Sequence, residues 1–142
     1  MFFFFICLSF LISTAYSQTK EDSFSIKICA ANYIEGFYEG NSERIEKALH
    51  PELSKRVIRT DPQSGMQRLD RLSALTLINI TKGGGGKSIP QDQRIFEFKI
   101  LYITGSNASV RKVAKGFFEY IHLVKRAGEW KIINVLWDFV QN

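Results

Sequence analysis

The sequence contains few cysteines, histidines and prolines, and each shortage excludes a class of protein. Its 142 residues include only two cysteines, two histidines and three prolines. Two cysteines exclude a small domain held together by several disulfides, and no His, Cys and Asp spacing matches a zinc or calcium site. We therefore expect neither a metal nor a cofactor. The low proline content and 45% hydrophobic residues exclude a collagen-like or largely disordered chain, and the length fits one domain.

The first 17 residues lack any charge, and residues 2–12 are almost wholly apolar. This run is shorter than the roughly 20 residues of a membrane-spanning helix, and Ala15 and Ser17 are small residues suited to a cut before Gln18. We predict a signal peptide over residues 1–17, a single domain over 18–142, and export to the periplasm or the medium without stable membrane insertion. Because no Lys or Arg lies near Met1, a buried N-terminal strand or an uncleaved interfacial anchor stays open as an alternative.

Helical spacing dominates the first half of the chain. Ile26, Ala30, Tyr33 and Phe37 recur at the spacing of one helix face, which predicts a helix over residues 19–39 that ends at Gly40. We expect Thr19 and Asp22 to form its capping box. A short helix capped by Asn41 or Ser42 is predicted over residues 43–49, followed by a further turn over 53–58. A third helix, capped by Ser73, is predicted before the glycines 83–86.

From Arg94 onward apolar residues alternate with polar ones, as in half-buried strands. We predict strands near residues 96–104, over 108–126 and over 130–140, joined by turns at 105–107 and 127–128. Helices followed by sheet indicate the α+β class, with the helices packed on one face of a curved antiparallel sheet.

Two features that suggest nucleotide or nucleic-acid binding fail on inspection. The run from Lys82 to Ser88 resembles a phosphate loop, but Thr81 occupies the position of the first glycine and a helix precedes the run. We expect a flexible loop there. The net charge of +5 comes from cations at strand ends and turns rather than from one helical stripe, so we expect no nucleic-acid partner.

A polar and aromatic set remains at positions where a cavity would lie. If residues 108–126 form one strand, Tyr120 and His122 share its less charged face, and Trp137 and Tyr33 approach them. We expect no carboxylate to face this cavity, although a β-bulge would reverse the facing beyond it. The ligand-binding candidates are Tyr33, His50, Arg56, Tyr120, His122 and Trp137, and Lys55 belongs to the same polar set.

Four segments resemble a known superfamily: 32–41 (NYIEGFYEGN), 48–53 (ALHPEL), 119–123 (EYIHL) and 128–137 (GEWKIINVLW). Together they resemble the nuclear transport factor 2-like superfamily, and most closely the exported proteins labelled "putative lumazine-binding". The resemblance implies a cone-shaped, cystatin-like α+β fold with an internal cavity, and often a homodimer formed through the sheet. Enzymes of this superfamily, such as ketosteroid isomerase and scytalone dehydratase, place an acid/base group inside the cone.

Three hypotheses of function follow. The first is an exported, non-catalytic protein that binds a small planar or anionic molecule, with rings stacking on Tyr33 and Trp137. The second is an isomerase or dehydratase-like enzyme that uses His50 or His122 as its acid/base group. The third is a structural or interaction protein that dimerises through the sheet. The sequence leaves enzymatic activity undecided and favours binding.

Overall fold

The computed structural model describes the backbone of residues 4–140 and the side chains of residues 20–140. Its helices are α1 (Phe4–Glu39), α2 (Ser42–Ala48) and α3 (Ala74–Lys82), with a short 3₁₀ turn at Gln91–Gln93. Its strands are β1 (Leu49–Thr60), β2 (Gln67–Ser73), β3 (Glu97–Thr104), β4 (Asn107–Ala114), β5 (Phe117–Arg126) and β6 (Glu129–Phe139). The side chains of the expected signal peptide, residues 1–17, lie outside the described ones, and its cleavage stays a prediction.

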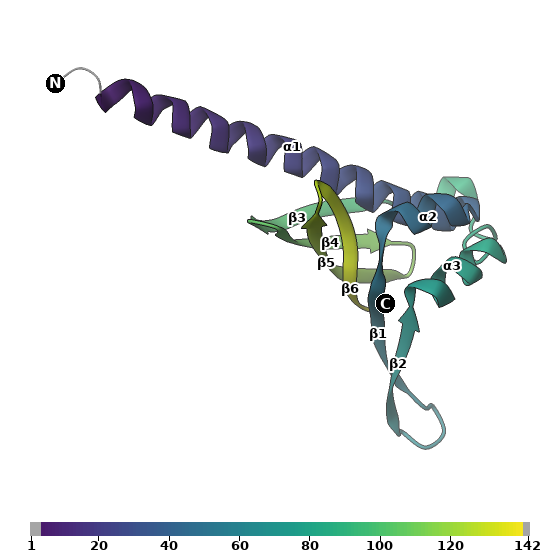
Figure 1. Ribbon diagram of the computed structural model, residues 1–142. Helices are drawn as coiled ribbons and strands as arrows, with labels where there is room; N and C mark the ends of the chain where they lie inside the picture. Colours follow the sequence, from purple (N-terminus) through teal and green to yellow (C-terminus); the bar gives the residue numbers. More distant parts are fainter. Residues whose placement is uncertain (1–3, 141–142) are drawn as a thin grey trace.

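The six strands form one curved sheet in the order β2-β1-β6-β5-β4-β3. All neighbours are antiparallel except β1 and β6, which run parallel, so the expected antiparallel sheet has one exception. The helices lie together on one side of the sheet, and the β1–β2 hairpin extends beyond them as an arm (Figure 1). This arrangement confirms the α+β class.

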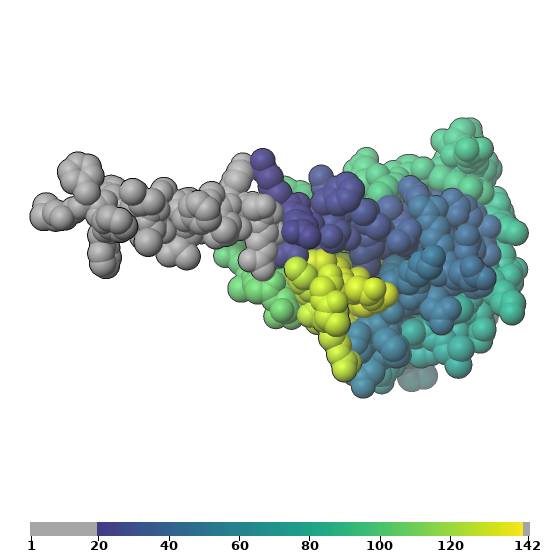
Figure 2. All heavy atoms as spheres, turned by 45° about the horizontal axis from the view of Figure 1, so that its top comes forward, coloured from purple at the N-terminus to yellow at the C-terminus, as the bar shows by residue number. Residues whose placement is uncertain are grey.

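Helix α1 supplies the core with one buried face. Ile26, Tyr33 and Ile34 are at most 3% exposed and pack toward the sheet. Asp22 does not cap this helix, because α1 begins at Phe4. Its carboxylate accepts hydrogen bonds from Lys125 Nζ at 2.7 Å and from Trp130 Nε1 at 3.1 Å. These bonds hold α1 against β5 and β6, and Figure 2 shows the purple residues of α1 beside the yellow C-terminal strand.

The two later helices begin where the sequence predicts. The side chain of Asn41 accepts a hydrogen bond from the Arg44 backbone N–H, and Ser73 does the same for Thr76. The helical turn expected over residues 53–58 is wrong, because that segment belongs to β1 and pairs with β2 and β6. Pairing on both sides comes from distant parts of the chain, and it overrides the weak local preference.

The strand predicted over residues 108–126 is also wrong. The chain reverses at Lys115 and Gly116, where Gly116 adopts a φ of 79°, so the segment forms the β4–β5 hairpin. Inward-facing residues are even-numbered in β4 and odd-numbered in β5, which places Lys112 directly opposite Glu119. The even-numbered residues of β5 therefore face outward.

The glycine-rich loop after α3 packs on α1 instead of standing free. A Cβ atom added to Gly86 would lie 2.4 Å from the backbone oxygen of Phe37, so only glycine permits this approach. The loop thereby closes one end of the space between α1, α3 and the sheet.

Candidate functional site

A cavity of about 490 Å³ lies between α1, α3, the glycine-rich loop and the inner face of the sheet. Its walls are mostly apolar and aromatic. The described residues that line it are Tyr33, Ile34, Phe37, Lys55, Arg59, Leu72, Leu77, Ile80, Gly85, Ser88, Ile89, Lys112, Lys115, Phe117, Glu119, Trp137 and Phe139. The volume falls within the range of about 300–1,000 Å³ that is usual for ligand pockets.

A buried charged cluster forms the polar part of this cavity. Glu119 on β5 is 0% exposed, and its Oε1 atom accepts hydrogen bonds from Lys55 Nζ and, at 3.0 Å, from the Tyr33 hydroxyl. Lys55 also donates to the Tyr33 oxygen at 2.9 Å. Lys112 is 1% exposed, and its Nζ lies 2.7 Å from Glu119 Oε2. We call Tyr33, Lys55, Lys112 and Glu119 the buried cluster.

The contact of Lys112 with Glu119 has fewer hydrogen-bond partners around it than the contact of Lys55 with Glu119. Lys112 Nζ and Glu119 Oε2 contact each other as an ion pair, and neither atom has a further hydrogen-bond partner among the described residues. Aromatic rings surround the ammonium group instead. Its nitrogen lies 4.8 Å from the ring centre of Tyr33 and 5.1 Å from that of Phe117.

The cluster shifts the titration of Glu119, Lys112 and Tyr33. Burial by itself raises the pKa of Glu119, but the charges of Lys112 and Lys55 outweigh burial and lower that pKa to about 2. Burial lowers the pKa of Lys112 to about 8; Glu119 opposes this change and Lys55 reinforces it. Burial and the adjacent Glu119 charge raise the pKa of the Tyr33 hydroxyl. At neutral pH the cluster therefore holds two cations and one anion.

The cavity opens where exposed residues join its lining. Arg59 on the β1–β2 arm, Lys115 in the β4–β5 turn and Phe139 near the end of β6 are all exposed. The guanidinium carbon of Arg59 lies 5.4 Å from the ring centre of Trp137 and 5.0 Å from that of Phe139. Its Nε atom is also 3.6 Å from the carboxylate of Asp70.

With this geometry in place, the sequence can be compared with known proteins. Residues 21–138 match the family described as "putative lumazine-binding". The chain belongs to this family. The match covers every described residue of the cavity lining except Phe139.

The fold of this family member matches those of solved nuclear transport factor 2-like (NTF2-like) proteins. One of unknown function from Shewanella baltica has a TM-score of 0.65 at 16% identity, covering 85% of this chain and 95% of that one. One with a cystatin-like fold from Novosphingobium aromaticivorans has a TM-score of 0.68 at 11% identity, covering 91% and 88%. A protein from the same organism described as a putative scytalone dehydratase has a TM-score of 0.56 at 13% identity, covering 89% of each chain. No curated protein sequence matches the chain.

Two of the sequence-predicted residues of this family member line the cavity. Tyr33 is part of the buried cluster, and Trp137 forms a wall, with its ring 5.1 Å from Lys55 Nζ. Trp137 also contacts Phe117 edge to face, with ring centres 6.0 Å apart. The inward facing that we expected for these two residues is therefore correct.

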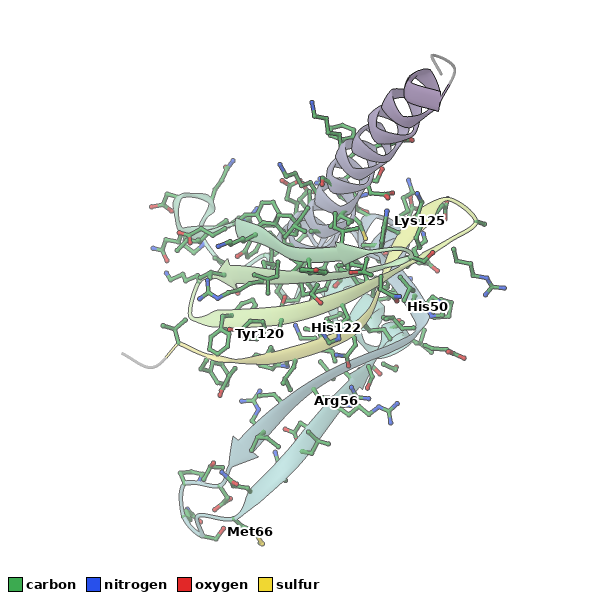
Figure 3. All side chains as sticks on the ribbon, turned by 90° about the vertical axis from the view of Figure 1, so that its left-hand side faces the viewer. His50, Arg56, Met66, Tyr120, His122 and Lys125 are labelled. Atoms are coloured by element: carbon green, nitrogen blue, oxygen red, sulfur yellow. The ribbon has the colours of Figure 1, made fainter. Side chains whose placement is uncertain are left out.

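The other four candidates lie elsewhere. Tyr120 and His122 are exposed on the outer face of the sheet, because the hairpin reverses the facing of β5 (Figure 3). His122 Nδ1 lies 3.2 Å from Asn134 Nδ2, and Arg56 donates to Asn134 Oδ1 at 2.5 Å, so Arg56 belongs to that outer network. His50 is not in the cavity lining, and its Nδ1 accepts a bond from the Glu52 backbone N–H at 3.2 Å.

Glu119 and Lys112 are functional candidates that the sequence did not reveal. We expected no carboxylate in the cavity, placed Glu119 on the charged outer face of one long strand, and counted Lys112 among the cations at strand ends and turns. The dipeptide Lys115-Gly116 was the available signal, because a glycine at a two-residue turn favours a hairpin. With that turn recognised, period-two alternation brings Glu119 inside, opposite Lys112.

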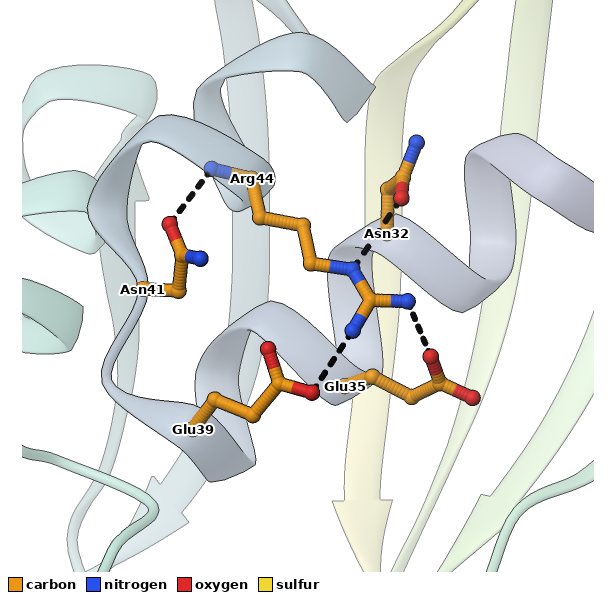
Figure 4. Close-up of polar contacts among 5 residues, drawn as sticks. All are labelled: Asn32, Glu35, Glu39, Asn41 and Arg44. Atoms are coloured by element: carbon orange, nitrogen blue, oxygen red, sulfur yellow. Dashed lines mark hydrogen bonds and ion pairs between the residues drawn. The ribbon is translucent and has the colours of Figure 1, made fainter.

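A second polar cluster, at the junction of α1 and α2, is separate from the cavity. Arg44 pairs with Glu35 and, at 2.7 Å, with Glu39, and its Nε donates to Asn32 at 3.1 Å (Figure 4). Asn41 caps the same helix. None of these residues lines the cavity, and their contacts serve to fix α2 against α1.

The described residues provide neither a metal site nor a membrane-spanning helix. No group of three or more His, Cys, Asp or Glu residues there could hold a metal ion. Over the same part of the chain, no helix has the length and apolar character needed to span a membrane.

Proposed function

We propose that this protein binds a small molecule with a planar, aromatic part in the cavity between α1 and the sheet. The observation that carries this proposal is an aromatic-walled cavity of about 490 Å³ with a buried polar cluster at one side. Apolar walls with a few convergent polar groups are the usual form of a small-molecule site. The rings of Phe117, Trp137 and Tyr33 supply surfaces on which a planar group can pack. The family description is consistent with a heterocyclic ligand.

Export completes the proposal. The uncharged, apolar residues 1–17 support a signal peptide, and the mature chain would begin at Gln18. Intact mass of the protein recovered from its own source decides this point. A mass equal to residues 18–142 supports export, and the mass of residues 1–142 contradicts it.

Turnover by a cavity histidine is the weaker candidate. His122 lies on the outer face and His50 is absent from the described lining, so neither can act on a molecule in the cavity. Glu119 is a poor general base, because a carboxylate with a pKa of about 2 has little affinity for a proton at neutral pH. Binding without chemistry accounts for these features better.

The outer face of the sheet supports a homodimer in addition to ligand binding. Tyr120 and Leu136 are paired neighbours on β5 and β6 and are 44% and 52% exposed. Exposed apolar side chains on one sheet face are suited to a second copy of the chain. Sedimentation equilibrium of the wild type and of Tyr120→Glu tests this: the wild type should be dimeric and the variant monomeric. A monomeric wild type contradicts the dimer.

Native mass spectrometry of the protein from its own source is the direct test of binding. We expect an additional mass that disappears when the same sample is denatured. Trp137→Ala should reduce the fraction of protein that carries this mass, because the side chain forms a cavity wall. Leu101→Ala is the matched control, since Leu101 on β3 is 44% exposed and lies outside the described lining. Equal occupancy in both variants contradicts a ligand in this cavity.

A further inference from the structure

The described lining of the cavity carries an excess of positive charge. Four of its residues are cations (Lys55, Arg59, Lys112 and Lys115), and Glu119 is its one acid. Asp70 partly compensates Arg59 at the mouth. Inside, the single charge of Glu119 is shared between two buried lysines, so one positive charge has no counterion among the described residues.

Lys112 is the cation whose donors are least satisfied. Lys55 donates to Glu119 and to the Tyr33 oxygen, whereas the ion pair with Glu119 is the one polar contact that the described residues give Lys112 Nζ. The group is 1% exposed and lines the cavity. A buried ammonium group is stable only when it is paired and hydrogen-bonded, so this nitrogen lacks an acceptor on its cavity side.

A neutral acceptor would satisfy the free donors of Lys112 but would leave the charge unbalanced. An anion does both, and charge-assisted hydrogen bonds are about twice as strong as neutral ones. The surplus inside the cluster is one charge, which matches one anionic group. The aromatic walls next to Lys112 match a ring attached to that group. Arg59 and Lys115 at the mouth would attract the anion from solution.

We propose that the cavity binds an aromatic monoanion, such as an aromatic carboxylate, whose anionic group pairs with Lys112 while its ring packs on Phe117 and Trp137. This inference rests on the small-molecule function proposed above and names its ligand class. Glu119 holds both lysines in place, and the ligand supplies the second counterion.

Two probes with one ring system test the charge requirement. 2-Naphthoate is anionic at pH 7, and 2-naphthylmethanol is its neutral analogue. We expect the wild-type protein to bind 2-naphthoate at least tenfold more tightly, measured by isothermal titration calorimetry. Lys112→Met should remove this preference, while Lys55 stays paired with Glu119. Lys99→Met is the matched control, because Lys99 is exposed and lies outside the described lining.

The outcomes distinguish the proposal of an anionic ligand from the general proposal of small-molecule binding. Equal affinity for the two probes overturns the anion proposal and supports an aromatic site without charge selection. Binding of neither probe counts against both proposals. A preference for 2-naphthoate that persists in Lys112→Met, with unfolding by urea unchanged, shows that the anion sits elsewhere and overturns the role of Lys112.

Proton uptake gives an independent readout. The groups that face Lys112 are Glu119 from β5, Lys55 from β1 and Tyr33 from α1, and Lys115 and Arg59 share the cavity. Because the pKa of Lys112 is about 8 without ligand, an anion bound beside it should take up about half a proton at pH 8 and almost none at pH 6. Calorimetry with 2-naphthoate in two buffers of different ionisation enthalpy measures this uptake. No uptake at pH 8 overturns the pairing with Lys112.

Discussion

Breaking the buried cluster and replacing it whole should have opposite effects on stability. In Glu119→Leu, both lysines lose their counterion, and Tyr33 loses the acceptor of its hydroxyl. The pKa of Glu119 falls from 4.5 to about 2 in the folded protein. At 1.36 kcal/mol per pKa unit, the lost charge corresponds to about 3 kcal/mol of unfolding free energy at pH 7. This agrees with the range of about 3–5 kcal/mol for removing one member of a buried ion pair.

The combined variant Tyr33→Phe, Lys55→Met, Lys112→Met and Glu119→Leu removes every charge of the cluster and the hydroxyl that depends on it. Apolar side chains of similar size avoid the desolvation of three buried charges, so we expect a free energy of unfolding equal to or above that of the wild type. Binding of 2-naphthoate should be lost in this stable protein, which separates function from folding.

Equilibrium unfolding by urea at pH 7, followed by circular dichroism, measures both effects. A loss below about 1 kcal/mol in Glu119→Leu would refute the inference that the cluster is electrostatically coupled. If the combined variant is as unstable as the single one, packing around the site, and not its charge, determines stability.

Three further predictions concern pH, the α1 anchor and the lone described cysteine. Because the pKa of Glu119 is lowered in the folded protein, the contribution of this residue to the free energy of unfolding is complete above pH 4.5 and is lost as the pH falls. Urea unfolding should therefore give a free energy about 3 kcal/mol lower by pH 2, and Glu119→Leu should not show this decrease. Asp22→Asn should lower the unfolding free energy by about 1–3 kcal/mol, because it weakens the bonds from Lys125 and Trp130. Burial raises the pKa of the Cys29 thiol to about 12, so iodoacetamide at pH 8 should alkylate it in urea but not in the native protein, as peptide mass spectrometry would show.

Each of these has a clear contrary result. Equal acid sensitivity in the wild type and Glu119→Leu would place the acid-labile group elsewhere. Glu21→Gln is the control for Asp22→Asn, since Glu21 is exposed beside it on α1; equal effects would contradict the anchor. Rapid labelling of native Cys29 would contradict its burial.

Local patterns in the sequence were sufficient for the fold class. The helical spacing of Ile26, Tyr33 and Phe37, the caps Asn41 and Ser73, and the later alternation are short-range signals, and all survive in the structure. The family resemblance rested on such segments too, and the family match confirms it. Inward facing was correctly predicted for Tyr33 and Trp137, whereas their role in binding stays a prediction.

Which residues of β5 face the cavity could not be predicted from such local patterns. A hairpin of two residues at Lys115 and Gly116 changes the parity of every residue after it, and one missed turn moved Tyr120 and His122 inside and Glu119 outside. Alternation specifies which residues share a face, but it does not specify which face is covered.

The sequence by itself therefore determined the three helical segments, the α+β class and the apolar character of the core, because these depend on spacing within one segment. Only the tertiary structure decided that Lys55, Lys112, Glu119 and Tyr33 meet. They come from β1, β4, β5 and α1, and a buried ion cluster is tolerated only where packing removes water and brings the charges together. The chemistry of the cavity therefore depends on the contact between these four residues, and no single segment carries it.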